Sequence, residues 1–179
     1  QCGVEVVEHI IVKPVAEKKT VSFTQLWSGA FARRTLMLWL IWFGIVYSYY
    51  GIFIWLPSLL VKQGYSIVQS FEYVLVMILA QLPGYVAAAW LVEKLGRKAT
   101  LAGFIGMCAV SAYFFGQADT VSMIMFWGCL MSFFNLGAWG VLYTYTPEQY
   151  PTNIRAFGSG WASAIGRMGG IVAPMVVTH

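Results

Sequence analysis

The chain has 179 residues, of which 59% are apolar and only 10% are charged, and its mean hydropathy is +0.70. Soluble domains carry about 25% charged residues, so this composition excludes an ordinary water-soluble fold and predicts an all-α membrane protein. The formal net charge is +4, but the basic residues flank apolar segments, so we expect no nucleic-acid partner.

Residues 1–34 mix charged residues with short apolar runs, and we predict that they form a cytoplasmic connecting segment. Within it, Ser22 and Gln25 have the spacing of a capping box. This spacing predicts a short interfacial helix ahead of the first membrane span. Arg33 and Arg34 then mark the membrane boundary.

Five apolar stretches follow, at about residues 35–60, 68–92, 99–117, 121–146 and 154–177. Each is close to or above the ~20 residues that a helix needs to cross a ~30 Å hydrocarbon core. The runs are continuous rather than alternating, so they predict helices and not barrel strands. We therefore expect residues 35–179 to form one helical membrane domain in contact with the bilayer.

Small residues recur at every fourth position in two of these stretches, which predicts close packing of helix backbones. They are Ala80, Gly84 and Ala88 in the second stretch, and Gly158, Ala162, Gly166 and Gly170 in the fifth.

Basic residues lie almost entirely on one side of the predicted spans. With five alternating spans, nine Lys or Arg residues fall on the side of the N-terminus, and Lys62 alone falls on the other. Lys and Arg are enriched in cytoplasmic loops, so we predict a multi-pass protein of the cell membrane with a cytoplasmic N-terminus. The nine are Lys13, Lys18, Lys19, Arg33, Arg34, Lys94, Arg97, Lys98 and Arg155.

Arg167 lies deep in the fifth apolar stretch. If the helix enters the bilayer near Ile154, Arg167 is roughly 20 Å along a ~30 Å core, where an arginine costs ~2.5–3.5 kcal/mol. Ser159, Ser163 and Arg167 recur at helical spacing and form one polar stripe, which predicts a polar cavity. We interpret Arg167 as an anion-binding or gating residue. The alternative is an arginine paired with a backbone carbonyl, or with a carboxylate on a helix outside this chain.

Tyrosines of the first span and the amides Gln81 and Asn135 lie near the centres of their predicted spans, away from the helix ends where aromatic residues usually gather. Trp139 and Tyr143 follow Asn135 at spacing i+4 and i+8. Their aromatic faces and amides, together with one cation, suit a flat, anionic organic solute. Hydrogen bonding between helices is the alternative for the two amides. The candidate substrate-binding residues, besides Arg167, are Tyr47, Tyr50, Gln81, Asn135, Trp139 and Tyr143.

The sequence contains no phosphate-binding loop, metal-ligand cluster or nucleophile triad. We therefore predict that the chain is not an enzyme and that it uses no metal or cofactor. No acidic residue lies centrally in any predicted span, so a proton-coupling group would lie elsewhere, or the substrate would carry the proton.

Two loop motifs resemble those of the major facilitator superfamily. "EKLGRK" (Glu93 to Lys98) is similar to its cytoplasmic loop signature, with Glu93 in place of the usual Asp. "TPEQYPTNIRAFGSGWASAIGRMGG" (Thr146 to Gly170) resembles the loop and penultimate helix of its organic-ion and metabolite:proton symporter branch. Within that branch, the chain looks most like bacterial niacin or nicotinamide permeases.

The resemblance implies a fold and a site. The five spans would correspond to helices seven to eleven of a twelve-helix bundle, with an N-terminal six-helix domain and a last helix outside this chain. Tyr47, Tyr50, Asn135, Trp139 and Tyr143 would then lie in cavity-lining positions. Family members that carry organic anions resemble this chain in having Arg at the position of Arg167.

The same resemblance implies a cytoplasmic gate, in which charged pairs hold the bundle in one state and release it in another. Static surface pairing is the alternative, worth ~0–1 kcal/mol per pair. The candidate gate residues are Glu93, Gly96, Arg97, Lys98, Glu148 and Arg155.

These observations predict a secondary active transporter that moves a small organic solute by alternating access, with proton coupling. The favoured solute is an organic anion such as an aromatic carboxylate or nicotinate. The alternatives are a carrier of sugars or neutral metabolites, a membrane scaffold or sensor that does not transport, and an inactive fragment.

Overall fold

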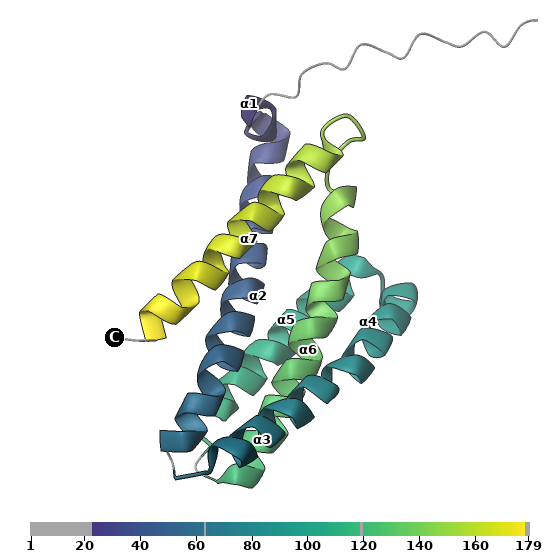
Figure 1. Ribbon diagram of the computed structural model, residues 1–179. Helices are drawn as coiled ribbons and strands as arrows, with labels where there is room; N and C mark the ends of the chain where they lie inside the picture. The colour runs from purple at the N-terminus through teal and green to yellow at the C-terminus, as the bar shows by residue number, and fades with distance from the viewer. Residues whose placement is uncertain (1–22, 63, 119, 178–179) are drawn as a thin grey trace, which may run out of the picture.

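The computed structural model describes residues 23–62, 64–118 and 120–177. These residues form α-helices joined by short turns, with no strand among them, which confirms the predicted all-α class (Figure 1). Ser22 and the rest of the predicted connector before it lie outside the described residues. The helices are α1 (Phe23–Leu26), α2 (Gly29–Lys62), α3 (Ile67–Leu79), α4 (Gln81–Leu95), α5 (Arg97–Gly116), α6 (Val121–Glu148) and α7 (Arg155–Val177).

Within the described residues, four helical segments are long and apolar enough to cross a membrane, and they overlap the first four predicted spans. The fifth predicted span forms α7, a 23-residue helix that is not among those four. Glycines, serines and two arginines lower its hydropathy, so a membrane crossing by α7 stays a prediction. The four segments are Phe31–Ser58, Ile67–Leu95, Arg97–Gly116 and Val121–Glu148.

The second predicted span is divided at Ala80 into α3 and α4. Pro83 explains the break, because a proline ring inside a helix clashes with the carbonyl four residues earlier, here that of Leu79. In the first turn of a new helix the missing N–H costs nothing. The start of α3 is fixed by a capping box in which Ser66 Oγ accepts from the Gln69 N–H at 3.2 Å.

The long helices pack in two groups. Helix α2 packs along α7, whereas α6 is flanked by α4 and α5 (Figure 1). Helix α3 contacts both α2 and α6 at the end of the bundle opposite α1. The direct contact between α2 and α6 includes hydrogen bonds from Trp42 Nε1 to Thr146 Oγ1 at 2.9 Å and from Asn135 Nδ2 to Ser48 Oγ at 2.6 Å.

Small residues allow the close helix approaches that the sequence predicts. Gly84 of α4 lies against the backbone of Phe133 on α6, and Gly169 of α7 lies against the Phe43 carbonyl of α2. Ala88 and Ala162, from the two predicted small-residue series, are buried. Backbone approach of this kind is how membrane helices gain packing energy without a hydrophobic driving force between them.

We expect Gly84→Ala to destabilise the bundle by about 1–3 kcal/mol, the usual cost of overpacking, because the added methyl group meets backbone atoms of Phe133. The measurement is the thermal unfolding midpoint of the purified protein in detergent. The matched control is Gly106→Ala, where nothing lies within 4 Å of the added Cβ. A midpoint for Gly84→Ala equal to that of the control would contradict this account of the packing.

Candidate functional site

Arg167 lines a small cavity between α2, α6 and α7, with a volume of about 110 Å³. Three further residues predicted to bind substrate lie with it, so the fold brings together four of the seven. The lining residues are Trp42, Val46 and Tyr50 of α2, Trp139 and Tyr143 of α6, and Ser163 and Arg167 of α7.

The Arg167 side chain is exposed, and no hydrogen bond or ion pair joins its guanidinium to any of the described residues. A pairing with a backbone carbonyl, one of the alternatives from the sequence, is therefore absent from the part of the chain that the structure describes. The guanidinium keeps five N–H donors in a planar fork that matches a carboxylate.

Aromatic rings form the walls of this cavity. Trp42 and Tyr143 meet edge to face, with their centroids 4.9 Å apart, and the Trp42 ring is fixed by its hydrogen bond to Thr146. Trp139 meets Tyr49 edge to face at 5.5 Å. Rings held in this way offer flat apolar faces to an aromatic ligand at little entropic cost. The lining thus places a cation beside aromatic faces, in a volume below the ~300–1,000 Å³ of most small-ligand pockets.

Trp42 was missing from the predicted site. A pattern in the sequence could have located it, because Trp42, Val46 and Tyr50 occur at positions i, i+4 and i+8. That spacing places the three side chains on one face of α2.

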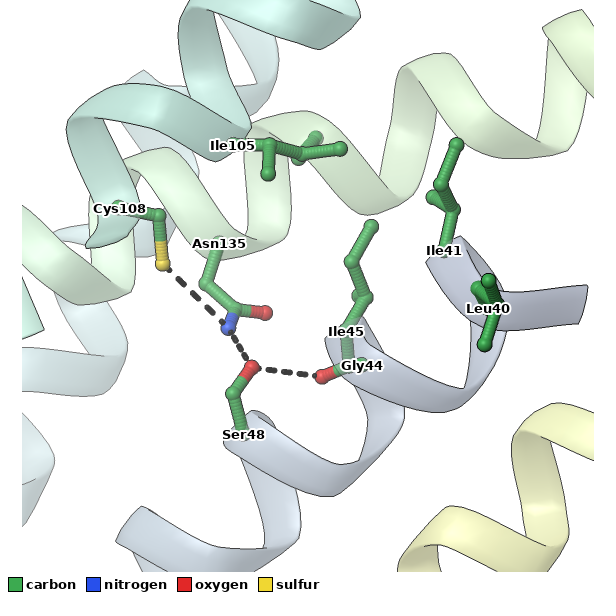
Figure 2. Close-up of a pocket in the computed structure, with 9 residues that line it drawn as sticks. Leu40, Ile41, Gly44, Ile45, Ser48, Ile105, Cys108 and Asn135 are labelled. Atoms are coloured by element: carbon green, nitrogen blue, oxygen red, sulfur yellow. Dashed lines mark hydrogen bonds between the residues drawn. The ribbon is translucent and has the colours of Figure 1, made fainter. Parts of the chain in front are cut away.

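Asn135 lies in a second pocket, between α2, α5 and α6, with a volume of about 380 Å³ (Figure 2). Its Nδ2 donates to Ser48 Oγ at 2.6 Å and to Cys108 Sγ at 3.7 Å. Its Oδ1 is buried and has no hydrogen-bond partner among the described residues. A buried acceptor without a partner costs about 1–3 kcal/mol. The pocket is lined by Leu40, Ile41, Gly44, Ile45, Ser48, Ile105, Cys108, Asn135 and Ala138.

The two pockets lie on opposite faces of α2. At 100° per residue, Ile41, Ile45 and Ser48 point away from the face that carries Trp42 and Tyr50. The structure therefore does not place Asn135 beside Arg167, although both were predicted to bind one solute.

Gln81 and Tyr47 are also separate from the Arg167 cavity. Gln81 is 5% exposed at the start of α4, and its Nε2 has no partner in the described part of the chain. Tyr47 is half-buried and stacks on Phe43, with the ring centroids 5.9 Å apart. Their predicted contact with a substrate stays a prediction.

At one end of the bundle, Arg97 and Glu148 form an ion pair between the start of α5 and the end of α6. Both side chains are close to half exposed. Gly96 joins α4 to α5 with φ of +81°, a left-handed conformation that glycine adopts without strain. Glu93 and Arg97 also line a pocket of about 380 Å³ between α4, α5 and α6.

The other two predicted gate residues have different surroundings. Arg155 Nε donates to the Tyr150 carbonyl at 3.4 Å rather than to a carboxylate. Lys98 is exposed in the first turn of α5. Of the six candidates, the described residues thus show one acid–base pair, and the gating role of all six stays a prediction.

Tyr150, in the loop between α6 and α7, was not among the predicted site residues, although the quoted stretch from Thr146 to Gly170 contains it. It is 2% exposed. Its hydroxyl donates to Thr35 Oγ1 at 3.1 Å, and Thr35 in turn donates to the Leu26 carbonyl at 3.1 Å. Gly158 packs on the Tyr150 ring, where a Cβ would lie 2.7 Å from a ring carbon. This chain of contacts ties the loop to α1 and α2.

The long apolar helices and the polar groups between them define a multi-pass membrane bundle. The chain belongs to the Major Facilitator Superfamily, whose family model matches residues 6–175. This confirms the family resemblance found in the two loop motifs.

Among curated relatives, the niacin transporter NiaP of Acinetobacter baylyi is 83% identical over 177 residues, which is 99% of this chain and 40% of that protein. The putative niacin/nicotinamide transporter NiaP of Bacillus subtilis is 59% identical over 152 residues, 85% of this chain and 38% of that protein. Organic cation/carnitine transporter 7 of Arabidopsis thaliana is 29% identical over 193 residues, 98% of this chain and 37% of that protein. The chain thus spans 37–40% of the length of these relatives.

Tyr150→Phe should lower the free energy of unfolding by about 0.5–1.5 kcal/mol, the net value of one hydrogen bond. The substitution should also change how the free energy of unfolding depends on pH. Burial raises the pKa of the Tyr150 hydroxyl above its usual value of 10.0, so its contribution to stability is present below pH 10 and is lost as the pH rises further. Unfolding midpoints measured at about pH 8 and about pH 11 test this. If the unfolding midpoint fell by the same amount between the two pH values in the parent and in Tyr150→Phe, this role of the Tyr150 hydroxyl would be contradicted.

Proposed function

We propose that this chain works as part of a secondary active transporter that moves a small organic anion across the cell membrane. The observation that carries the proposal is Arg167, whose guanidinium is unpaired among the described residues and lines a cavity with Trp42 and Tyr143. A guanidinium within a membrane-spanning domain is costly unless a ligand or water compensates it. A carboxylate that enters this cavity gains two charge-assisted hydrogen bonds from one side chain.

The favoured substrate is an aromatic carboxylate such as nicotinate. The rings of Trp42, Trp139 and Tyr143 supply flat faces for an aromatic ring, and Arg167 supplies the counter-charge. The name of the Acinetobacter relative, a niacin transporter, supports the same substrate class. The solute is thus recognised by both its ring and its charge.

The mechanism we propose is alternating access. The two helix groups, α2 with α7 and α6 with α4 and α5, form one side of the substrate path. A second six-helix domain and a further last helix complete the bundle, and rocking of the two halves exposes the site to each side in turn. We also propose that transport is coupled to protons, with the N-terminus in the cytoplasm.

Arg167→Ala in the complete transporter should lower the efficiency of nicotinate uptake by about ten- to hundredfold, because it removes the charge-assisted hydrogen bonds to the carboxylate. Arg167→Lys should fall between parent and Ala, since it keeps the charge but loses the planar fork. The measurement is the initial rate of labelled nicotinate uptake at several concentrations, corrected for the amount of protein in the membrane.

The control is Arg34→Ala, which removes an exposed arginine near the start of α2 that does not line the cavity. Its uptake should match the parent. Normal nicotinate uptake by Arg167→Ala at normal membrane abundance would refute the anion site.

The Arg97–Glu148 pair is proposed to latch the cytoplasmic side. Arg97→Gln should lower the uptake rate by about fivefold, because losing a pair worth ~1 kcal/mol changes an equilibrium by that factor. The unfolding midpoint should change little. The charge-swapped double variant, Arg97→Glu with Glu148→Arg, should recover much of the rate. Unchanged kinetics in Arg97→Gln would assign the pair to static surface pairing.

A further inference from the structure

We propose that Thr146 is a positioning residue for the Arg167 cavity, although it does not line that cavity. Through its hydrogen bond to Trp42, it holds the indole ring so that the site favours a flat, aromatic anion over a saturated anion of equal charge. This inference rests on the proposed function, because it assigns the selectivity of the same anion site to a residue outside it.

The hydrogen bonds around Thr146 can run in one direction only. Its hydroxyl donates to the Leu142 carbonyl, one turn earlier in α6, at 2.7 Å. An indole nitrogen can donate but not accept, so Trp42 Nε1 donates to Thr146 Oγ1, at 2.9 Å. Thr146 is 1% exposed and Trp42 is 3% exposed, so water does not compete for this bond. The N–H edge of the Trp42 ring is therefore directed at α6.

Two further neighbours restrict the same ring. Tyr143 meets it edge to face, with the ring centroids 4.9 Å apart. On the side of α7, Gly166 lies so close that an added Cβ would be 3.1 Å from a carbon of the indole. Trp39 provides the contrast, because its Nε1 is buried without a partner among the described residues. Trp42 is thus held by a hydrogen bond, a ring contact and a close backbone.

This arrangement divides the recognition of a ligand between two side chains. Because Thr146 uses the N–H of Trp42, the indole offers the cavity only its carbon atoms, and the charge of a ligand is left to Arg167. A ring that is already fixed loses little freedom when a ligand packs on it. Two aromatic rings also gain more than their buried area alone provides, whereas a saturated ring gains only the area. Thr146 therefore acts on selectivity for ring type and not on recognition of charge.

Loss of the Thr146 hydroxyl should release the ring. Valine has nearly the shape of threonine but accepts no hydrogen bond, so Thr146→Val leaves the indole N–H of Trp42 buried without a partner. A buried donor without a partner is costly, and the ring turns toward another acceptor. Thr146→Ser keeps a hydroxyl at the same place and therefore keeps the bond.

The test uses the complete transporter in membranes and measures how benzoate and cyclohexanecarboxylate inhibit the uptake of labelled nicotinate. Both competitors carry one carboxylate on a six-membered ring, and only benzoate is flat. The quantity compared is the ratio of their inhibition constants, which does not depend on the amount of active protein. The matched control is Thr100→Val. Thr100 is 2% exposed, and its hydroxyl also donates to a carbonyl four residues earlier, at 2.9 Å, but it accepts from no side chain among the described residues.

We expect Thr146→Val to reduce the preference for benzoate by about fivefold, while Thr146→Ser and Thr100→Val keep the preference of the parent. In a Trp42→Phe background, Thr146→Val should change the ratio no further, because the N–H that Thr146 holds is already gone. A role in stability alone would lower uptake and leave the ratio unchanged.

A second replacement tests the same bond from the side of the indole. Benzothienylalanine in place of Trp42 keeps the shape of the ring and lacks the N–H, so it should reproduce the ratio of Thr146→Val. It decides the question should Thr146→Val fail to reach the membrane.

A parent-like ratio in Thr146→Val, or in the benzothienylalanine protein, would overturn this inference and leave the anion carrier intact. A parent protein that benzoate inhibits no better than cyclohexanecarboxylate would overturn it as well. Absence of nicotinate uptake by the parent, or normal uptake by Arg167→Ala, would instead refute the proposed function and this inference with it. The two failures are therefore distinguishable.

Discussion

The structure depends on the hydrogen bonds that join α2 to α6. Trp42 binds Thr146 toward one end of the contact, and Ser48 accepts from Asn135 further along. Apart from this contact, α2 packs mainly on α7, and α6 packs on α4 and α5. In hydrocarbon, water cannot satisfy a polar group that loses its partner. The same bonds therefore hold the two helix groups together and fix how α2 is rotated against α6.

That rotation creates two chemically different pockets on the two sides of α2. One face of the helix meets α6 and α7 around Arg167, and the other meets α5 and α6 around Asn135. In each pocket one polar atom group lacks a partner among the described residues, a guanidinium in the first and an amide carbonyl in the second. The first of these groups is ionisable, and an ionisable group within a membrane domain marks a candidate functional site.

The end of the bundle where α6 leads into the loop before α7 is joined by contacts of a different kind. The Tyr150–Thr35–Leu26 chain is buried and neutral, so salt does not weaken it, whereas the Arg97–Glu148 pair is half exposed and screened. The neutral chain suits a permanent attachment of α1 and α2 to the loop after α6. The exposed pair suits a contact that breaks and reforms, because its net value is only ~0–1 kcal/mol.

The sequence alone determined the helical membrane class, four of the spans and the close approach at Gly84, because the cost of exposing polar backbone to lipid leaves few alternatives. Its loop motifs also identified the family. Periodicity placed Tyr50, Trp139 and Tyr143 on helix faces, but it could not state which faces meet. Only the tertiary structure decided that these three lie with Arg167 while Asn135 lies on the other side of α2. It also added Trp42 and Tyr150, since helix rotation and long-range hydrogen bonds depend on packing between segments about 100 residues apart.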